Sequence, residues 1–151
     1  MKHLLIVYHS QTGHTKKLAD AVLRGAQEED TVTTRLLRAV EAKLEDLIWC
    51  DGLIVGTPEN FGYMSGGIKD FFDRTYNEAE PLHLNIPYAL FVSAGNDGTG
   101  AVREVDRIML GYPMKKVAEP LIVRGEISAS GLAAASELGL TLASGLGFGI
   151  F

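Results

Sequence analysis

The residues best suited to chemistry lie in one turn near the start of the chain, Tyr8-His9-Ser10-Gln11-Thr12-Gly13-His14-Thr15. The turn follows an apolar run and precedes an amphipathic stretch, so we expect it to join a strand to a helix. The first N–H groups of a helix lack partners within the helix and lie at the positive end of its dipole. The hydroxyls of Ser10, Thr12 and Thr15, with the amides after Gln11, could therefore surround one phosphate group.

The type of phosphate ligand follows from what the turn does not contain. It has no lysine, and it matches neither the Gly-x-x-x-x-Gly-Lys-Ser/Thr loop of nucleotide triphosphatases nor the Gly-x-Gly-x-x-Gly fingerprint of dinucleotide folds. The segment therefore indicates a phosphomonoester held by hydroxyls and amides. A capped helix start without any ligand remains the alternative, because Ser and Thr are ordinary N-cap residues.

A second candidate loop is Thr57-Pro58-Glu59-Asn60-Phe61-Gly62-Tyr63, which continues through Met64-Ser65-Gly66-Gly67. Phe61 and Tyr63 stand beside glycines, so a flat apolar ring could lie against an aromatic side chain while backbone amides reach its polar edge. Taken alone, Phe61 or Tyr63 could equally be a residue that packs against the rest of the protein and contacts no ligand.

A third candidate loop is Ser93-Ala94-Gly95-Asn96-Asp97-Gly98-Thr99-Gly100. Its glycines let backbone N–H groups approach a ligand closely, and Asn96 offers a further donor or acceptor. A glycine-rich turn after a strand is also common without any ligand.

Short apolar runs alternate with amphipathic stretches along the whole chain, which is typical of a parallel sheet covered by helices on both faces. We expect strands at Leu4–Tyr8, Val32–Leu37, Leu53–Thr57, Tyr88–Ser93 and about Lys116–Val123, the last at an edge because of Pro120. We expect helices at about Thr15–Glu28, Glu41–Ile48, Gly66–Asn77, Gly100–Leu110 and Ser130–Ser144. Right-handed crossovers give an α/β, doubly wound, five-stranded parallel sheet of order 2-1-3-4-5. The three loops then follow strand ends at one edge, where such sheets bind ligands.

Length, charge and cysteine content limit the number of domains, the kinds of partner and the compartment. The 151 residues suit a single domain, and a net charge of −5 disfavours nucleic acid as a partner. Cys50 is the only cysteine, which rules out an intramolecular disulfide and favours a reducing, cytoplasmic compartment. Its position beside Trp49 favours a buried structural thiol. The segment Ala129–Phe151 is apolar, but Glu137 and its many small residues favour a helix lying on the sheet over a membrane span.

With these loops in view, the chain resembles the flavodoxin-like family of FMN proteins. The segment Ser10–Thr15 is similar to that family's phosphate loop, Ser/Thr-x-Thr-Gly-x-Thr. The second loop is similar to the flavin loop of NAD(P)H:quinone oxidoreductases of the tryptophan-repressor-binding-protein type. The residues that carry this likeness are Gly56-Thr57-Pro58, Phe61-Gly62, Met64-Ser65-Gly66 and Ile68-Lys69-Asp70-Phe71.

The resemblance implies one FMN-binding domain over residues 1–151, with the phosphate on the first loop and the isoalloxazine ring between the other two. The implied cofactor-binding residues are Ser10, Gln11, Thr12, Gly13, His14, Thr15, Thr57, Pro58, Glu59, Asn60, Phe61, Gly62, Ser93, Ala94, Gly95, Asn96 and Gly98. No aromatic residue occurs in the third loop, unlike in typical electron-carrying flavodoxins, so we expect one face of the ring to be open.

An open face suits a hydride donor and a quinone, so the resemblance favours an FMN-dependent oxidoreductase using NAD(P)H. No catalytic acid–base pair need appear in the sequence, because the flavin carries the chemistry. We expect no metal site, since His3, His9 and His83 share no spacing that suggests metal ligands. A flavodoxin-type electron carrier that docks redox proteins is the alternative. A phosphoacceptor receiver domain shares the architecture, but strand three ends Gly56-Thr57 where that class needs an aspartate. We expect no nucleic-acid or membrane partner and consider a homodimer.

Overall fold

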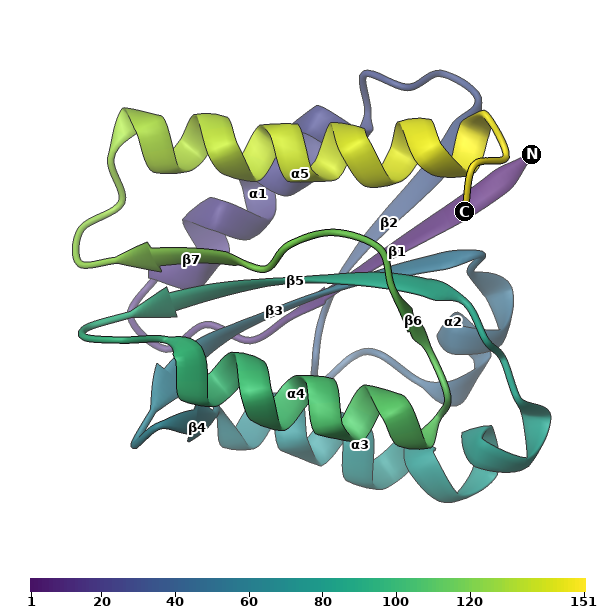
Figure 1. The fold of residues 1–151 in the computed structure, drawn as a ribbon, viewed down its shortest axis with the longest axis horizontal. Coiled ribbons are helices and arrows are strands. Elements are labelled where there is room, and N and C mark those ends of the chain that lie inside the picture. The colour runs from purple at the N-terminus through teal and green to yellow at the C-terminus, as the bar shows by residue number, and fades with distance from the viewer.

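A sheet of seven strands forms the centre of the computed structural model, which describes residues 1–151 (Figure 1). The strands β2, β1, β3 and β5 lie side by side and are parallel, with β6 and β7 on the outer side of β5. The doubly wound order expected from the sequence is therefore confirmed. The strand bounds are β1 Lys2–Tyr8, β2 Val32–Arg38, β3 Gly52–Asn60, β4 Tyr63–Met64, β5 Pro87–Ala94, β6 Lys115–Lys116 and β7 Leu121–Arg124.

The predicted fifth strand is divided into β6 and β7. Tyr88 pairs with Lys116 and Phe91 pairs with Leu121, so the four residues Val117–Pro120 stand opposite only Ala89 and Leu90. This excess of chain, together with a proline that has no N–H to donate, interrupts the ladder. The interruption lies at the edge of the sheet, where a proline is tolerated.

Helices cover both faces of the sheet, as the alternating sequence pattern predicts (Figure 1). Helices α1 and α5 pack on one face, and α2, α3 and α4 pack on the other. Alternate residues of β1 enter the two cores: Leu5 and Val7 face α3, whereas Leu4 and Ile6 face α1. The helix bounds are α1 His14–Ala26, α2 Leu44–Trp49, α3 Gly66–Ala79, α4 Thr99–Gly111 and α5 Ala129–Gly147, with a short 3₁₀ helix at Glu80–Leu82.

Helices α1 and α5 approach each other at glycines. A side chain at Gly25 would collide with the backbone of Ser136, and one at Gly139 would collide with the backbone of Val22. Backbone-to-backbone contact of this kind holds α1 firmly against α5. Helix α5 thus lies on the sheet, as expected for the apolar segment near the end of the chain. No helix in the structure is both long and apolar enough to span a lipid bilayer.

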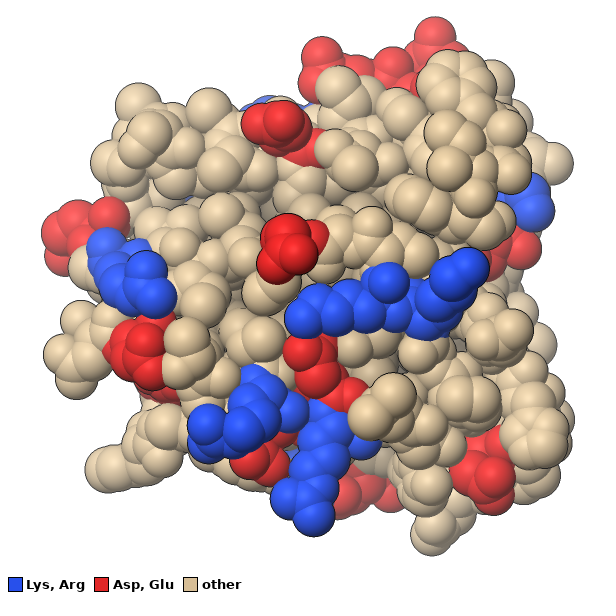
Figure 2. Space-filling view, in the orientation of Figure 1, with Lys and Arg blue, Asp and Glu red and all other residues tan.

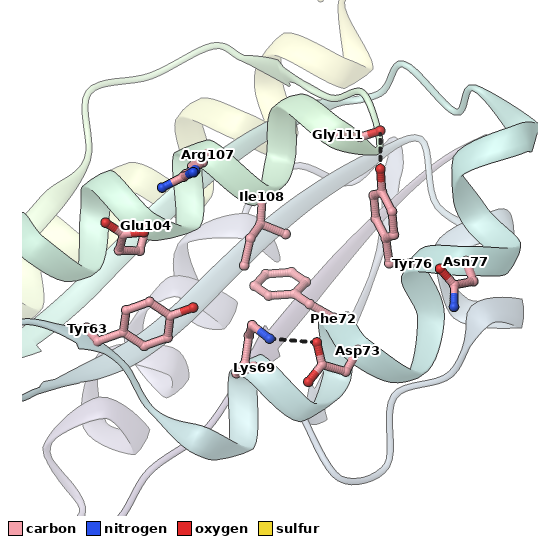
Figure 3. A pocket seen from close by; sticks show the side chains of 10 residues that line it. All are labelled: Tyr63, Lys69, Phe72, Asp73, Tyr76, Asn77, Glu104, Arg107, Ile108 and Gly111. Atoms are coloured by element: carbon pink, nitrogen blue, oxygen red, sulfur yellow. Dashed lines mark hydrogen bonds and ion pairs between the residues drawn. The ribbon is translucent and has the colours of Figure 1, made fainter.

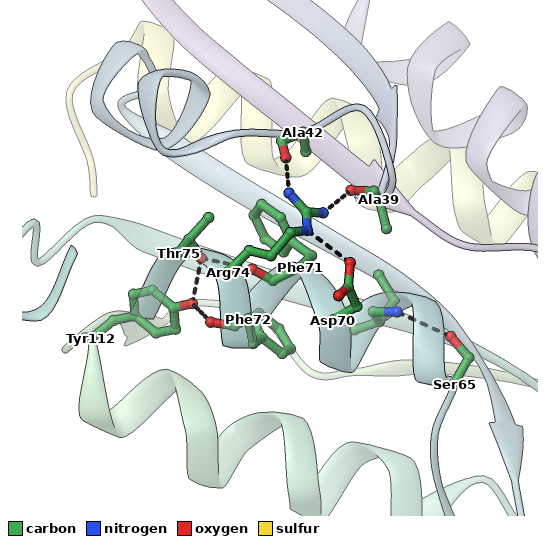
Figure 4. A network of polar contacts seen from close by, with 10 residues as sticks. Ala39, Ala42, Ser65, Asp70, Phe71, Phe72, Arg74, Thr75 and Tyr112 are labelled. Atoms are coloured by element: carbon green, nitrogen blue, oxygen red, sulfur yellow. Dashed lines mark hydrogen bonds and ion pairs between the residues drawn. The ribbon is translucent and has the colours of Figure 1, made fainter. Parts of the chain in front are cut away.

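A polar network holds α3 against the loop after β2 (Figure 4). The guanidinium of Arg74 donates to the backbone oxygens of Ala39 and Ala42, at 2.7 and 2.9 Å, and to the Asp70 carboxylate at 2.7 Å. Charge-assisted bonds from one rigid fork to several acceptors fix the relative position of the two segments. The network therefore anchors the helix that follows the second candidate loop.

Charged side chains are mixed in sign on the face shown in Figure 2. Basic and acidic groups alternate over α4 and β6, whereas the surface of α5 is nearly free of charge. The sequence of α5 agrees, because Glu137 is its only charged residue. This face therefore carries no patch of a single sign.

Candidate functional site

One cavity at the carboxyl ends of the strands joins all three predicted loops. It has a volume of about 220 Å³, and ten of its twelve lining residues are among those named from the sequence. These are Gln11, Thr12, His14, Thr15, Pro58, Glu59, Asn60, Ser93, Ala94 and Gly95. The crossover topology brings together segments that are far apart in the sequence, as expected for the ligand-binding edge of such a sheet.

The first loop presents free backbone donors to this cavity. The hydroxyl oxygen of Ser10 accepts from the N–H groups of Gly13 and Lys16, each at 3.2 Å, so this side chain shapes the turn. Gly13 precedes α1 with a φ of 101°, a conformation that favours glycine. The N–H groups of Thr12, His14 and Thr15 have no acceptor within the protein. These groups can therefore bind an anion.

The two threonines of this loop differ in their surroundings. Thr15 is buried, and its hydroxyl lies 2.7 Å from the buried hydroxyl of Ser93, which ties α1 to β5. Thr12 is exposed, and its hydroxyl has no partner in the protein. The Thr12 hydroxyl is thus available to a ligand, while that of Thr15 already has a structural role.

The second loop is a β-hairpin where the sequence suggested an irregular loop after Thr57. Strand β3 continues to Asn60 and pairs with antiparallel β4 across a turn of Phe61 and Gly62. Both turn residues have positive φ, 54° and 71°, which is the pattern of a type I′ turn. The side-chain amide of Asn60 donates to the Gln11 side chain at 2.8 Å and links the hairpin to the first loop.

Phe61 and several other predicted residues lie outside the cavity lining. The Phe61 ring is fully exposed at the tip of the hairpin. Ser10 and Gly13 line a neighbouring hollow of about 700 Å³. Thr57 is buried and accepts from the N–H of Ser65 at 3.0 Å. The remaining predicted residues, Gly62, Asn96 and Gly98, belong to the hairpin turn or the third loop and do not line the cavity.

The structure adds two lining residues that the sequence analysis missed, Gly125 and Glu126. They follow β7, and the Glu126 carboxylate lies 3.5 Å from Nε2 of His14. The signal was present, because the fifth strand also ends at the ligand-binding edge and a glycine follows it. Treating that turn like the other three would have found them.

A further hollow lies between α3 and α4, away from the first and third loops (Figure 3). It has a volume of about 520 Å³, and Phe72 and Tyr76 contribute aromatic surface to it. Its polar side chains include Lys69 and Asp73, which form an ion pair at 2.7 Å. Only Tyr63 connects it with the second loop, so this groove is not where the predicted residues converge.

Known proteins provide an independent comparison. The model of a family described as NADPH-dependent FMN reductase matches residues 37–126. A flavodoxin of Aquifex aeolicus is 44% identical over 73 residues, which cover 48% of this chain and 40% of that protein. An NAD(P)H dehydrogenase (quinone) of Acidithiobacillus ferrooxidans is 35% identical over 97 residues, covering 51% of this chain and 48% of that protein. The chain thus spans less than half the length of these two relatives.

Among solved structures, a flavodoxin from the domain Archaea superposes with a TM-score of 0.84 at 23% identity. The superposition covers 94% of this chain and 96% of that one. At this identity the likeness shows the fold, and it confirms the flavodoxin-like architecture.

Proposed function

The chain belongs to the NADPH-dependent FMN reductase family and is a flavodoxin-like FMN protein, and on this premise we propose that it passes electrons from NAD(P)H to a quinone or similar small acceptor. When bound, FMN supplies the redox chemistry, taking up hydride from a reduced nicotinamide and giving electrons to the acceptor. We also propose that residues 1–151 act as one FMN-binding domain in a reducing, cytoplasmic setting, which suits a chain whose only cysteine is buried.

The observation that carries the proposal is the cavity at the start of α1. Three free N–H groups lie at the positive end of a helix of 13 residues, beside the unpartnered Thr12 hydroxyl. A terminal phosphate needs donors of this kind and gains from the helix dipole. Gly13 leaves the approach clear, since nothing lies near the place where a side chain would begin. These residues fit the phosphate of FMN.

The hairpin and the third loop form the walls between which we place the isoalloxazine ring. Pro58, Glu59 and Asn60 line the cavity from the hairpin, and Ala94 and Gly95 line it from the third loop. Nothing lies within 4 Å of the place where a side chain at Gly95 would begin, and the adjacent Asn96 is exposed. A ring held there would keep one face accessible to nicotinamide.

The protein's contribution is therefore to bind and orient. The amides at the start of α1 hold the phosphate, and the Gln11–Asn60 hydrogen bond holds the first loop against the hairpin. Fixed donors and walls position two reactants without any protein acid or base. This agrees with a cavity whose lining consists of small and polar residues.

The experiment is to identify the cofactor and then follow its reduction. We expect heat-treated protein to release FMN, and stopped-flow mixing with NADPH or NADH to reduce the bound flavin faster than free FMN. Asn96→Tyr should place an aromatic ring beside the open face and slow reduction while FMN still binds. Release of FAD, or no flavin after reconstitution, would contradict the cofactor assignment. An Asn96→Tyr protein reduced at the wild-type rate would contradict the open face.

An electron carrier is the second candidate, and the similarity to the Aquifex aeolicus flavodoxin favours it. A carrier exchanges electrons with redox proteins and has no need to react with nicotinamide itself. The same stopped-flow measurement separates the two, because a carrier's flavin would be reduced by NADPH no faster than free FMN. Assays with quinones would then identify the electron acceptor, and sedimentation would determine whether the protein forms a homodimer.

A further inference from the structure

The carboxylate of Glu59 joins the two walls of the cavity. One of its oxygens accepts from the N–H of Gly98 at 2.8 Å, and the other accepts from the N–H of Ala101 at 3.1 Å. Glu59 belongs to β3, next to the hairpin turn, whereas Gly98 and Ala101 belong to the start of α4. A single side chain thus connects the second and third loops at the cavity that it lines.

The backbone supports the same connection. The position that a side chain at Gly100 would occupy is filled by the carbonyl of Gly62, so the hairpin turn lies directly against the first turn of α4. Gly98 itself is buried and has a φ of 84°. The hairpin and α4 therefore meet without intervening side chains, and the Glu59 carboxylate adds two hydrogen bonds between them.

A carboxylate suits this place better than an amide of the same shape. Both partners of Glu59 are N–H donors, and a carboxylate presents two acceptor oxygens. A glutamine would present one oxygen and one NH₂ group, and the NH₂ group would face a donor. The first turn of α4 also favours a negative charge, because it is the positive end of the helix dipole.

From this geometry we infer that Glu59 is a positioning residue of the flavin site. It fixes the separation of the hairpin from the β5–α4 loop and keeps a negative charge at the wall of the cavity. The inference rests on the proposed function, since the gap it fixes is where we place the isoalloxazine ring. Walls that are already fixed bind a ligand at a lower entropic cost, and a nearby negative charge opposes the addition of electrons to the ring.

The first test uses the protein without flavin. Hydrogen exchange of the Gly98 and Ala101 amides is measured by NMR in the wild type, in Glu59→Gln and in Glu126→Gln. We expect exchange about ten times faster in Glu59→Gln because its bonds to these amides are lost or weakened. Glu126→Gln removes an exposed carboxylate from the same cavity and should leave both amides unchanged. Equal exchange in wild type and Glu59→Gln would overturn the inference.

The second test measures FMN affinity and the midpoint potential of the bound flavin. Glu59→Gln should bind FMN about tenfold more weakly, and its potential should be more positive because a negative charge is lost. Glu59→Asp keeps the charge but shortens the reach, so its affinity should fall while its potential stays closer to that of the wild type. An unchanged affinity and potential in both variants would overturn the inference. A wild type that binds no FMN would instead overturn the proposed function, and the exchange result would still report on the connection between the walls.

Discussion

At the scale of single residues, the hydroxyls near the cavity divide into those that bond within the protein and one, that of Thr12, that is free to contact a ligand. Ser10 accepts from the N–H groups of Gly13 and Lys16, and the Thr15 hydroxyl of α1 bonds to the Ser93 hydroxyl of β5. The Thr12 hydroxyl has no protein partner. Sequence spacing identifies all of them as candidates, because hydroxyls around Gly13 after a strand suit a phosphate. Spacing cannot separate the two roles, since the partner of Thr15 lies far away in the sequence.

The first prediction separates Thr12 from Thr15. Thr12→Ala should weaken FMN binding by roughly 1.5–3 kcal/mol, the value of a hydrogen bond to a charged group, without changing the stability of the flavin-free protein. Thr15→Ala should lower that stability by roughly 1–3 kcal/mol, because Ser93 loses its buried partner. Urea unfolding and FMN titration measure the two effects, with exposed Thr141→Ala on α5 as the control. Equal behaviour of Thr12→Ala and Thr15→Ala in both assays would contradict this division.

At the scale of elements, the sequence predicts the type and order of the strands and helices well and the hairpin poorly. Strands such as β1 are covered by helices on both faces of the sheet, so every residue of Leu4–Tyr8 is apolar and the continuous run predicts the strand. The extension of β3 through Pro58 to Asn60 is not visible, because proline and asparagine are poor strand residues. Pairing with β4 stabilises this extension, and that pairing depends on a turn in which Phe61 adopts a positive φ.

The second prediction concerns that turn. A non-glycine residue in the left-handed region costs about 1–2 kcal/mol, and asparagine tolerates it better than phenylalanine. Because the Phe61 ring is fully exposed, Phe61→Asn should raise the melting temperature of the flavin-free protein. Phe61→Ala keeps the unfavourable backbone and should not. If the ring contacts bound flavin, both variants should lose FMN affinity to a similar extent. A lower melting temperature for Phe61→Asn would show that the turn is not strained.

The third prediction concerns the network around α3. Arg74→Ala removes donors to the carbonyl oxygens of Ala39 and Ala42, and should destabilise the protein by about 1–3 kcal/mol. Arg74→Lys should recover only part of this, because an ammonium group lacks the planar fork. Thermal unfolding provides the measurement. The control is Arg103→Ala, because the Arg103 side chain is exposed and its ion pair with the neighbouring Glu104 is worth little. If Arg74→Lys were as stable as the wild type, the positive charge alone would account for the stabilisation.

At the scale of the whole molecule, the largest titration effects lie in the core on the α3 and α4 side of the sheet. Burial raises the pKa of the Cys50 thiol to about 12, and burial likewise raises the pKa of the Tyr112 phenol to about 12. Tyr112 is fully buried and bonds to Thr75 at 2.8 Å (Figure 4). Burial, then the bond to Asp106, also raises the pKa of Tyr88.

The fourth prediction is a loss of stability at high pH. These groups stay neutral in the folded state but release protons in the unfolded state from about pH 9 upward. The stability they contribute is complete below about pH 9 and falls progressively as the pH rises toward 12. Urea unfolding at pH 8 to 11 tests this, and Cys50→Ala should flatten the lower part of the decline. A wild-type stability that is constant over this range would contradict the prediction.

The glycine contact between α1 and α5 has a consequence for how the protein is made. Helix α1 carries the amides that we assign to the phosphate, yet part of the surface it packs against belongs to α5, a helix that leaves the ribosome much later. Until α5 has been synthesised, the side of α1 that carries Gly25 remains uncovered, and a helix of this length is marginal in water without its full packing surface. The nascent chain should therefore be unable to capture its cofactor, and flavin loading should follow the emergence of α5.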